Sequence, residues 1–375
     1  SCDHPLVLHV LTKKGKGFQA ALKQPEKYHG LGPYDAKTGE TPKGKPGAPP
    51  KWQDVFGDAM VKLCDRDSKL VGITAAMPSG TGLKKLKDEK PGRYYDVGIA
   101  EEHAVLFAAG MSAQGLRPVC AIYSSFLQRG YDCIIHDVAL QDLPVMFCMD
   151  RAGLSAADGP THHGLFDLSY LNCVPNVIVM QPKDEDELVD MMFTCSRQDH
   201  PTFIRYPRGE AVGVKIKDEP ILLEIGKAEV IQNFQRNGKK RVAFFGLGNM
   251  QSLARECIEE LGDDFDCALI NPRFVKPLDE ATHEFFARDS DLVVTLEDHV
   301  AIGGYGSRVI ELLHERDIQK SVQRVAWPDQ FIEHASGNGA LREKYGLTAK
   351  AVVSQIKTPS AETVETTGDT ASAVA

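Results

Sequence analysis

The sequence predicts an α/β protein of two doubly wound domains with mainly parallel sheets. Short apolar runs rich in β-branched residues alternate with amphipathic segments of helix length, which is typical of βαβ units. The alternation stops once, at the charged stretch GVKIKDEP (residues 213–220), and then resumes. The chain has 375 residues, which is more than one ordinary domain holds. We therefore expect one domain over residues 51–215 and a second over residues 220–356.

The expected first domain opens with the helical pattern of residues 52–67. Its other segments are strands at 69–74 and 93–98, a helix that opens at Glu101, a strand at 117–125, a helix at 127–142, strands at 144–150 and 176–182, a helix at 184–198 and a strand at 202–207. The expected second domain has strands at 221–231, 241–248, 267–272, 291–297 and 323–328 and helices at 252–262, 280–288 and 306–317.

The two ends of the chain lack this regularity. Residues 6–12 (LVLHVLT) have the pattern of a buried strand, and residues 13–50, rich in Gly, Pro and Lys, have that of a long connection. No signal or transit peptide precedes that strand, and we expect an upstream portion that is missing or lies on a separate chain. Residues 359–375 lack core formers and are predicted to form a disordered tail.

Composition excludes two classes of partner. Lys and Arg number 43 against 52 Asp and Glu, so no basic excess is available for a nucleic acid. No apolar run approaches the ~20 residues that a membrane span requires. The 9 cysteines are scattered and lie mostly in apolar stretches, as expected of reduced thiols in a cytoplasmic protein.

Polar and aromatic residues follow the strand-like runs of the expected first domain, and this topology should bring them to one edge of a sheet. They are Glu101, Tyr123, Phe126, Arg129, Arg151, Asp158, His162, His163, Arg205 and Arg208. Arginine forks suit phosphate and carboxylate groups, and histidine transfers protons near neutral pH. The pattern predicts an enzyme for a small anionic, phosphorylated substrate and leaves the reaction open.

Three of the patterns have simpler interpretations. Glu101 and Glu102 stand where a helix begins, and the helix macrodipole alone favours acids there. The adjacent His162 and His163 lack the spacing of a zinc site, and we assign no metal ligand in this chain. The stretch GLGNMQ (246–251) has two of the three glycines of a dinucleotide-binding loop and is interpreted as a strand-to-helix turn.

A more specific signal comes from the segments YYDVGIAEEHAV, AIYSSFLQRGYDCIIHDVALQDLPV, DRAGLSAADGPTHHGLFDLSYL, IRYPRG, RFVKPLD and GGYGS. Through them, residues 4–356 resemble the 1-deoxy-D-xylulose-5-phosphate synthase family of transketolase-like, thiamine-diphosphate-dependent enzymes. The resemblance implies a pyrimidine-binding domain over 51–215 and a transketolase C-terminal domain over 220–356. Residues 1–50 would be the remnant of a diphosphate-binding domain and a linker, and the family's Mg²⁺ ligands would lie upstream.

The resemblance also implies roles for single residues. Glu101 is implied to hydrogen-bond the aminopyrimidine ring of thiamine diphosphate, with Phe126 stacked on that ring and Phe18 in contact with the cofactor. The residues implied to act on the substrates are the catalytic His29, Asp158 and His162, the substrate-binding Tyr123 and Arg129, and the phosphate-binding pair Arg151 and Arg208.

The function that the resemblance implies is a transferase. It would decarboxylate pyruvate and join the remainder to D-glyceraldehyde 3-phosphate, as a cytoplasmic homodimer that feeds isoprenoid, terpenoid, thiamine and pyridoxal phosphate synthesis. The chain alone is expected to be inactive. Two alternatives stay open: a β-type subunit of a 2-oxoacid dehydrogenase or split transketolase, and a non-catalytic partner protein. The DRAG…THHG run disfavours the first, and the intact polar residues disfavour the second.

Overall fold

The computed structural model describes residues 2–25, 27–29, 32, 34–41 and 47–358. The chain divides into two compact units, residues 1–48 and 49–375, and each is described by itself. The tail predicted at 359–375 lies outside the described residues. Among the residues that are described, no helix combines the length and apolar character needed to cross a membrane.

The first unit contains one helix within its described part, α1 (Gln19–Lys23). Phe18 lies just before it, and its ring packs against Tyr28 and Tyr34 with centroids 5.4 and 5.8 Å away. The strand predicted at residues 6–12 is wrong, because these residues have no regular structure and their large apolar side chains are 64–93% exposed. A strand is stable only beside other strands, and the described part of this unit supplies none.

The second unit carries a seven-stranded sheet with the order β10-β5-β6-β4-β3-β1-β2. Its strands are β1 (Leu70–Thr74), β2 (Tyr94–Asp96), β3 (Arg117–Tyr123), β4 (Met146–Asp150), β5 (Ile178–Met180), β6 (Thr202–Arg205) and β10 (Phe274–Lys276). Every pair is parallel except β10 with β5. The predicted fold class, α/β with mainly parallel doubly wound sheets, is confirmed.

Helices bury both faces of this sheet. α2 (Trp52–Arg66) and α9 (Glu185–Cys195) share a core with one face, and α5 (Glu101–Ala113) shares a core with the other. Along β3, Val119 and Ala121 belong to the first core, whereas the intervening Cys120 belongs to the second. This alternation is the period of two that a strand buried on both faces requires.

The helix predicted at 127–142 begins earlier and is irregular. Four successive pieces form it: α6 (Ser124–Leu127), a 3₁₀ turn (Gln128–Gly130), α7 (Tyr131–Cys133) and a π-helical stretch (Ile134–Ala139). Gly130 lies where this segment passes α5, and a Cβ there would be 2.9 Å from Val105 Cγ2. The change of helical pitch accompanies this close passage.

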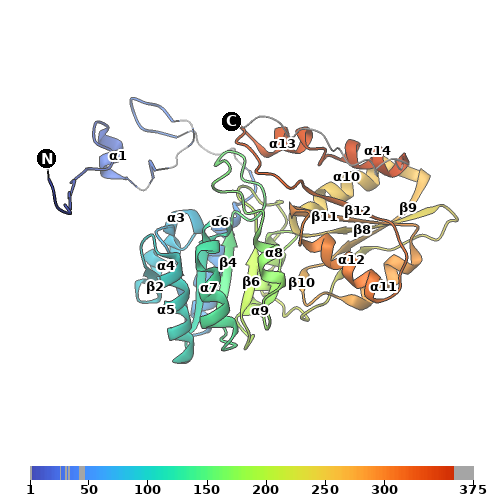
Figure 1. Cartoon of the computed structure of the whole chain (residues 1–375), viewed down its shortest axis with the longest axis horizontal. Helices are drawn as coiled ribbons and strands as arrows, with labels where there is room; N and C mark the ends of the chain where they lie inside the picture. Colours follow the sequence, from blue (N-terminus) through green and yellow to red (C-terminus); the bar gives the residue numbers. More distant parts are fainter. Residues whose placement is uncertain (1, 26, 30–31, 33, 42–46, 359–375) are drawn as a thin grey trace. The chain divides into compact units, whose positions relative to one another are not determined.

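A second sheet has five strands in the order β12-β11-β8-β9-β7, and only β7 with β9 is antiparallel. Its strands are β7 (Glu229–Gln232), β8 (Lys240–Gly246), β9 (Phe265–Asn271), β11 (Leu292–Val300) and β12 (Val322–Trp327). Figure 1 shows its two helical layers, which are α10 (Gln251–Leu261) with α14 (Ala349–Lys357) and α11 (Glu280–Asp289) with α12 (Tyr305–Glu315).

Several elements differ from the sequence prediction. The strand expected at 221–231 is confined to β7, because residues 224–227 form a turn with Gly226 at a φ of +74°. Among the described residues, the prediction missed strand β10 and six α-helices, which are α1, α3 (Pro78–Thr81), α4 (Lys84–Glu89), α8 (Asp167–Asn172), α13 (Asn338–Lys344) and α14. β10 follows β9 in the chain yet pairs with β5 of the first sheet. The boundary between two domains at residues 215–220 stays a prediction.

His283 on α11 is fully buried and uses both ring nitrogens. Its Nδ1 donates to the Asp279 carbonyl at 2.7 Å, and its Nε2 accepts from the Tyr305 hydroxyl at 2.6 Å. Burial lowers the pKa of His283 to about 4, so the imidazole is neutral in the folded protein. The ring also stacks on Phe245, with centroids 4.6 Å apart.

Replacing His283 with asparagine should destabilise the protein by about 1–3 kcal/mol near neutral pH, because buried polar groups lose their partner. The folded-state pKa is below the ordinary value of 6.5, so the contribution of the imidazole is complete above pH 6.5 and is lost as the pH falls toward 4. Urea unfolding measured across this pH window should show that the difference in the free energy of unfolding between wild type and variant becomes smaller as the pH falls. His314→Asn, at an exposed position, is the control, and a gap that stays constant for His283→Asn would contradict the prediction.

Candidate active site

The predicted site residues of the second unit lie on loops at the carboxyl ends of parallel strands. β2 leads into α5, β3 into α6, β4 into the loop 151–166, and β6 into residues 206–209. β3, β4 and β6 are consecutive neighbours in the sheet, so their ends lie side by side. We call the residues found there the strand-end cluster: Glu101, Tyr123, Phe126, Arg129, Arg151, Asp158, His162 and Arg208.

Arg151 is the most constrained member of the cluster. It has a φ of +58° directly after β4, and its residue surface is 8% exposed. Its Nη1 donates to Asp150 Oδ1 and to the Gly80 carbonyl, both at 2.6 Å. The guanidinium carbon lies 3.8 Å from the centre of the Tyr123 ring, a cation–π contact. The side chain is therefore held in one place before any ligand binds.

Asp158 lies between two guanidinium groups. Its Oδ1 is 3.1 Å from Arg208 Nη1, and its Oδ2 is 3.9 Å from Arg151 Nε. Both Asp158 Oδ2 and Arg151 Nε are buried, and neither has a hydrogen-bond partner among the described residues. The pair therefore keeps hydrogen-bonding capacity that a bound group could use.

Three rings pack together beside the arginines. Phe126 lies 5.1 Å from His162 and 5.5 Å from Tyr123, measured between ring centroids. Burial lowers the pKa of His162, and the nearby Asp158 only partly opposes this effect. Burial also raises the pKa of Tyr123 to about 12. Near neutral pH the cluster thus offers a neutral imidazole and a protonated phenol.

Glu101 is the first residue of α5 and is 1% exposed, whereas the neighbouring Glu102 is exposed. Its Oε2 accepts a hydrogen bond from Arg129 Nη1 at 2.9 Å. That bond and the carboxylate charge raise the pKa of Arg129. A helix-end charge alone needs no burial, so the position of Glu101 is unusual for a purely electrostatic role.

Two predicted site residues, Phe18 and His29, belong to the first unit. Phe18 is half-buried in the aromatic group with Tyr28 and Tyr34, and His29 is exposed. Their predicted roles at the cofactor and the reacting carbon stay predictions.

His163 and Arg205, which the sequence pattern placed among the polar residues of the site, have structural partners. His163 is 4% exposed, and both of its ring nitrogens contact backbone groups, Ser155 N at 3.0 Å and Glu333 O at 3.3 Å. Arg205 is fully buried and donates to Asp167, to Gln181 and to two carbonyl oxygens. Neither side chain is free to bind a substrate.

Sequence reasoning missed two contributors to the cluster. Asp150 ends β4 and anchors Arg151, and burial raises the pKa of Asp150 to about 6 although Arg151 opposes the shift. Gly80 supplies the carbonyl that accepts from Arg151, and a Cβ on it would lie 1.7 Å from Tyr123 Oη. Asp150 could have been predicted as a partner of Arg151, because it is an acid next to Arg151 in the sequence. No feature of the sequence near Gly80 predicts its contact with Arg151.

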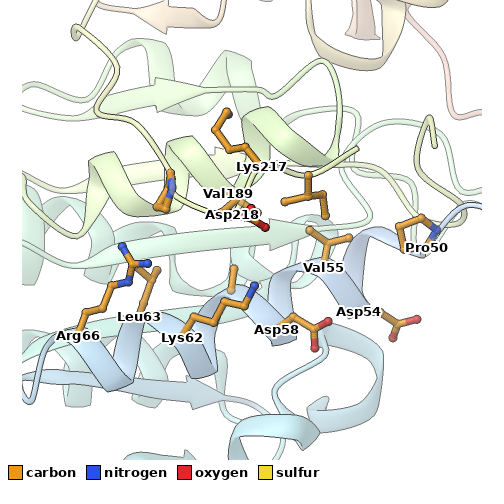
Figure 2. Close-up of a pocket in the computed structure, with 13 residues that line it drawn as sticks. Pro50, Asp54, Val55, Asp58, Lys62, Leu63, Arg66, Val189, Lys217 and Asp218 are labelled. Carbon is orange, nitrogen blue, oxygen red and sulfur yellow. The ribbon is translucent and has the colours of Figure 1, made fainter. Parts of the chain in front are cut away.

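A cavity of about 250 Å³ lies between α2, α9 and residues 216–220 (Figure 2). Val55, Leu63 and Val189 contribute apolar lining, and Lys217 at its edge is paired with Asp190 at 2.6 Å. No residue that lines the cavity belongs to the strand-end cluster, so the cavity is not part of the candidate active site.

Comparison with known proteins identifies the fold. Residues 48–212 match the transketolase pyrimidine-binding domain, and residues 231–352 match the transketolase C-terminal domain. A solved structure titled "Split gene transketolase, inactive beta4 tetramer" covers 82% of this chain and 97% of its own, with a TM-score of 0.70 and 29% identity. Transketolase from Campylobacter jejuni shares the fold, with a TM-score of 0.67 and 18% identity over 85% of this chain and 48% of its own.

The class is therefore transketolase-like. Two curated relatives have a more specific name within this class. 1-Deoxy-D-xylulose-5-phosphate synthase of Methylacidiphilum infernorum is 52% identical over 96% of this chain, and that of Acidobacterium capsulatum is 50% identical over 94%. The chain is thus similar to 1-deoxy-D-xylulose-5-phosphate synthases along nearly all of its own length. It spans 57% and 55% of the length of these two relatives.

Proposed function

We propose that the chain forms the pyrimidine-binding and C-terminal part of a 1-deoxy-D-xylulose-5-phosphate synthase. The complete protein would decarboxylate pyruvate and join the remaining two carbons to D-glyceraldehyde 3-phosphate, for isoprenoid, thiamine and pyridoxal phosphate synthesis. The observation that carries the proposal is the Arg151–Asp158–Arg208 group at the ends of neighbouring strands. Two guanidinium groups at one point suit the phosphate of the aldehyde substrate.

The residues of the cluster fit the pyrimidine end of thiamine diphosphate. Glu101 offers a carboxyl group that is 1% exposed, and Phe126 offers a half-buried ring face. When bound, the cofactor supplies the carbon centre at which 2-oxo acids are decarboxylated. Glu101 would hydrogen-bond the pyrimidine ring nitrogen and Phe126 would stack on the ring, with Phe18 as a further cofactor contact.

Mg²⁺ is proposed to accompany the diphosphate of the cofactor. Within the described part of the chain, no group of three or more His, Cys, Asp or Glu residues could hold a metal ion. We assign no residue of this chain to the metal.

The remaining members of the cluster are proposed to handle the substrates. The neutral His162 can exchange a proton with the reacting oxygen, and Asp158 orients the two arginines. We propose that the protonated hydroxyl of Tyr123 and the guanidinium of Arg129 donate hydrogen bonds to the pyruvate-derived group. His29 is proposed to act at the reacting carbon of the pyruvate-derived group.

We also propose that the complete protein is a cytoplasmic homodimer. Apolar side chains remain exposed just before and within α5, namely Ile99 at 81% and Leu106 at 43%, and after the π-helical stretch at Leu140, at 74%. A second copy of the chain would cover them, because exposed apolar groups of this size favour association. The molar mass in solution, measured by light scattering, tests this proposal.

The test of function is product formation by the full-length protein with thiamine diphosphate and Mg²⁺. Pyruvate and D-glyceraldehyde 3-phosphate should yield 1-deoxy-D-xylulose 5-phosphate and CO₂. A split transketolase would instead require a ketose donor, and a 2-oxoacid dehydrogenase subunit would need no phosphorylated aldehyde. Turnover with only those alternative substrates would reject the proposal.

Arg208→Ala in the full-length protein should raise KM for D-glyceraldehyde 3-phosphate and leave KM for pyruvate near its original value. A lost charged hydrogen bond costs about 1.5–3 kcal/mol, which corresponds to a roughly ten- to hundredfold fall in kcat/KM for that aldehyde. Unphosphorylated glyceraldehyde should be affected much less. Arg236→Ala, which removes an ion pair with Asp289 at the end of α11, is the matched control. Equal losses with both aldehydes would show that Arg208 has only a structural role.

A further inference from the structure

We propose that Asn338 and His163 are positioning residues, through which residues 331–338 hold the loop 153–163 in place. This loop carries Asp158 and His162, so the inference rests on the proposed function for their catalytic meaning. The segment that holds the loop follows β12 and ends at Asn338, the first residue of α13. The second half of the chain would thus set the geometry of an active site built mainly by the first.

Asn338 contacts the backbone of the loop in two places. Its Nδ2 donates to the Leu154 carbonyl at 3.3 Å, and its Oδ1 accepts from Ala156 N at 3.1 Å. The carbonyl of Ala156 accepts in turn from Ala335 N at 3.1 Å. The Asn338 side chain and the Ala335 backbone amide therefore satisfy three backbone polar groups of the loop, which are the Leu154 carbonyl and the N–H and carbonyl of Ala156.

His163, at the end of the loop, forms hydrogen bonds both within the loop and to residues 331–338. Its Nδ1 accepts from Ser155 N at 3.0 Å, which requires that this nitrogen carry no proton. The proton is then on Nε2, which donates to the Glu333 carbonyl at 3.3 Å. Burial lowers the pKa of His163, in agreement with the neutral ring that this pair of bonds needs. The ring thus joins the loop to residues 331–338.

A third contact fixes the start of the loop. Leu154 N donates to Asp298 Oδ1 at 3.3 Å, and the same carboxylate accepts from Trp327 Nε1 at 2.7 Å. Gly153 allows this approach, since a Cβ there would lie 2.4 Å from Asp298 Oδ2. Both Asp298 and Trp327 belong to the second sheet.

The anchored residues lie very close to the catalytic ones. Ser155 accepts hydrogen bonds on its carbonyl from Asp158 N at 3.0 Å and Gly159 N at 3.1 Å, and Gly159 O accepts from His162 N at 2.9 Å. A shift at Ser155 would therefore pass directly to both catalytic side chains. It would change the fit of Asp158 between Arg151 and Arg208 before it affected the core.

Asn338→Ala should speed amide hydrogen exchange in residues 154–159 by about tenfold, because a loop held by side-chain hydrogen bonds opens more readily without them. The experiment uses the full-length protein and peptide-level mass spectrometry. Gln323→Ala is the matched control, since that amide bonds to Val352 and Gln355 and not to the loop. Unchanged exchange in Asn338→Ala would overturn the proposal, whether or not the protein is a synthase.

Kinetics test the positioning role separately. Asn338→Ala should lower kcat/KM for D-glyceraldehyde 3-phosphate by about tenfold through KM, and leave KM for pyruvate within about twofold. A merely destabilising change would lower the apparent kcat and leave both KM values alone, which would overturn the positioning role. If Asn338→Ala does not fold, Asn338→Asp and His163→Ala replace it. Asn338→Asp keeps the acceptor for Ala156 and should give a smaller effect in both measurements.

Discussion

Glu101→Ala should slow exchange of the C2 proton of bound thiamine diphosphate by about 10²–10⁴-fold, the usual size of general acid–base assistance. The measurement uses the full-length protein in deuterated buffer, with the cofactor proton followed by NMR after an acid quench. The reason is the position of Glu101: its carboxylate is buried, and it accepts a hydrogen bond from Arg129 in the segment that also carries Phe126. Alanine would leave the pyrimidine ring nitrogen without a carboxyl partner.

Glu102→Gln is the matched control for this prediction. Glu102 shares the helix end with Glu101 and feels the same macrodipole, but its side chain is exposed. Its replacement should leave proton exchange nearly unchanged, and cofactor affinity measured by calorimetry should stay constant. Comparable losses from both variants would mean that the charge of the helix end, and not a particular carboxyl group, is what matters.

The residues that meet at the edge of the first sheet could be predicted, because alternating strands and helices place the loops after parallel strands at the same edge. Parallel strands end at one edge, so residues after β3, β4 and β6 had to meet. That is why Tyr123, Arg151 and Arg208 lie together in the structure as the sequence pattern predicted.

Partners that are distant in the chain were not predictable. β10 has only three residues (Phe274–Lys276), too few to show a strand pattern, and its place beside β5 depends on long-range contacts that no local pattern encodes. The apolar run at 6–12 shows the converse case. Its β-branched composition suits a strand, but a strand forms only where a neighbour offers backbone hydrogen bonds.

Arg205 and Arg208 show the same limit at the level of side chains. They lie three residues apart after the same apolar run, and the sequence pattern predicts the same role for both. The structure separates them, because Arg205 still belongs to β6 and is enclosed, whereas Arg208 lies beyond it with its side chain 34% exposed. Which arginine is free to bind an anion depends on Asp167 and Gln181, which come from other elements.

Arg205→Met should lower the free energy of unfolding by about 3–5 kcal/mol, the usual consequence of removing one partner of a buried ion pair. The methionine has similar length but leaves the Asp167 carboxylate, which is 1% exposed, without its guanidinium partner. It also leaves the carbonyls of Gly164 and Asp298 without the donors that Nη2 supplies. Urea unfolding at neutral pH gives the measurement.

Arg288→Met is the control for this change, because Arg288 forms an exposed pair with Glu284 on α11 and such pairs contribute little. Arg205→Lys should fall between the two, since an ammonium group keeps the charge but cannot reach all of the acceptors that the planar guanidinium serves. Suppose instead that Arg205→Met unfolds like wild type and weakens binding of D-glyceraldehyde 3-phosphate. Arg205 would then be a substrate ligand, and its complete burial would have to be relieved when substrate enters the site.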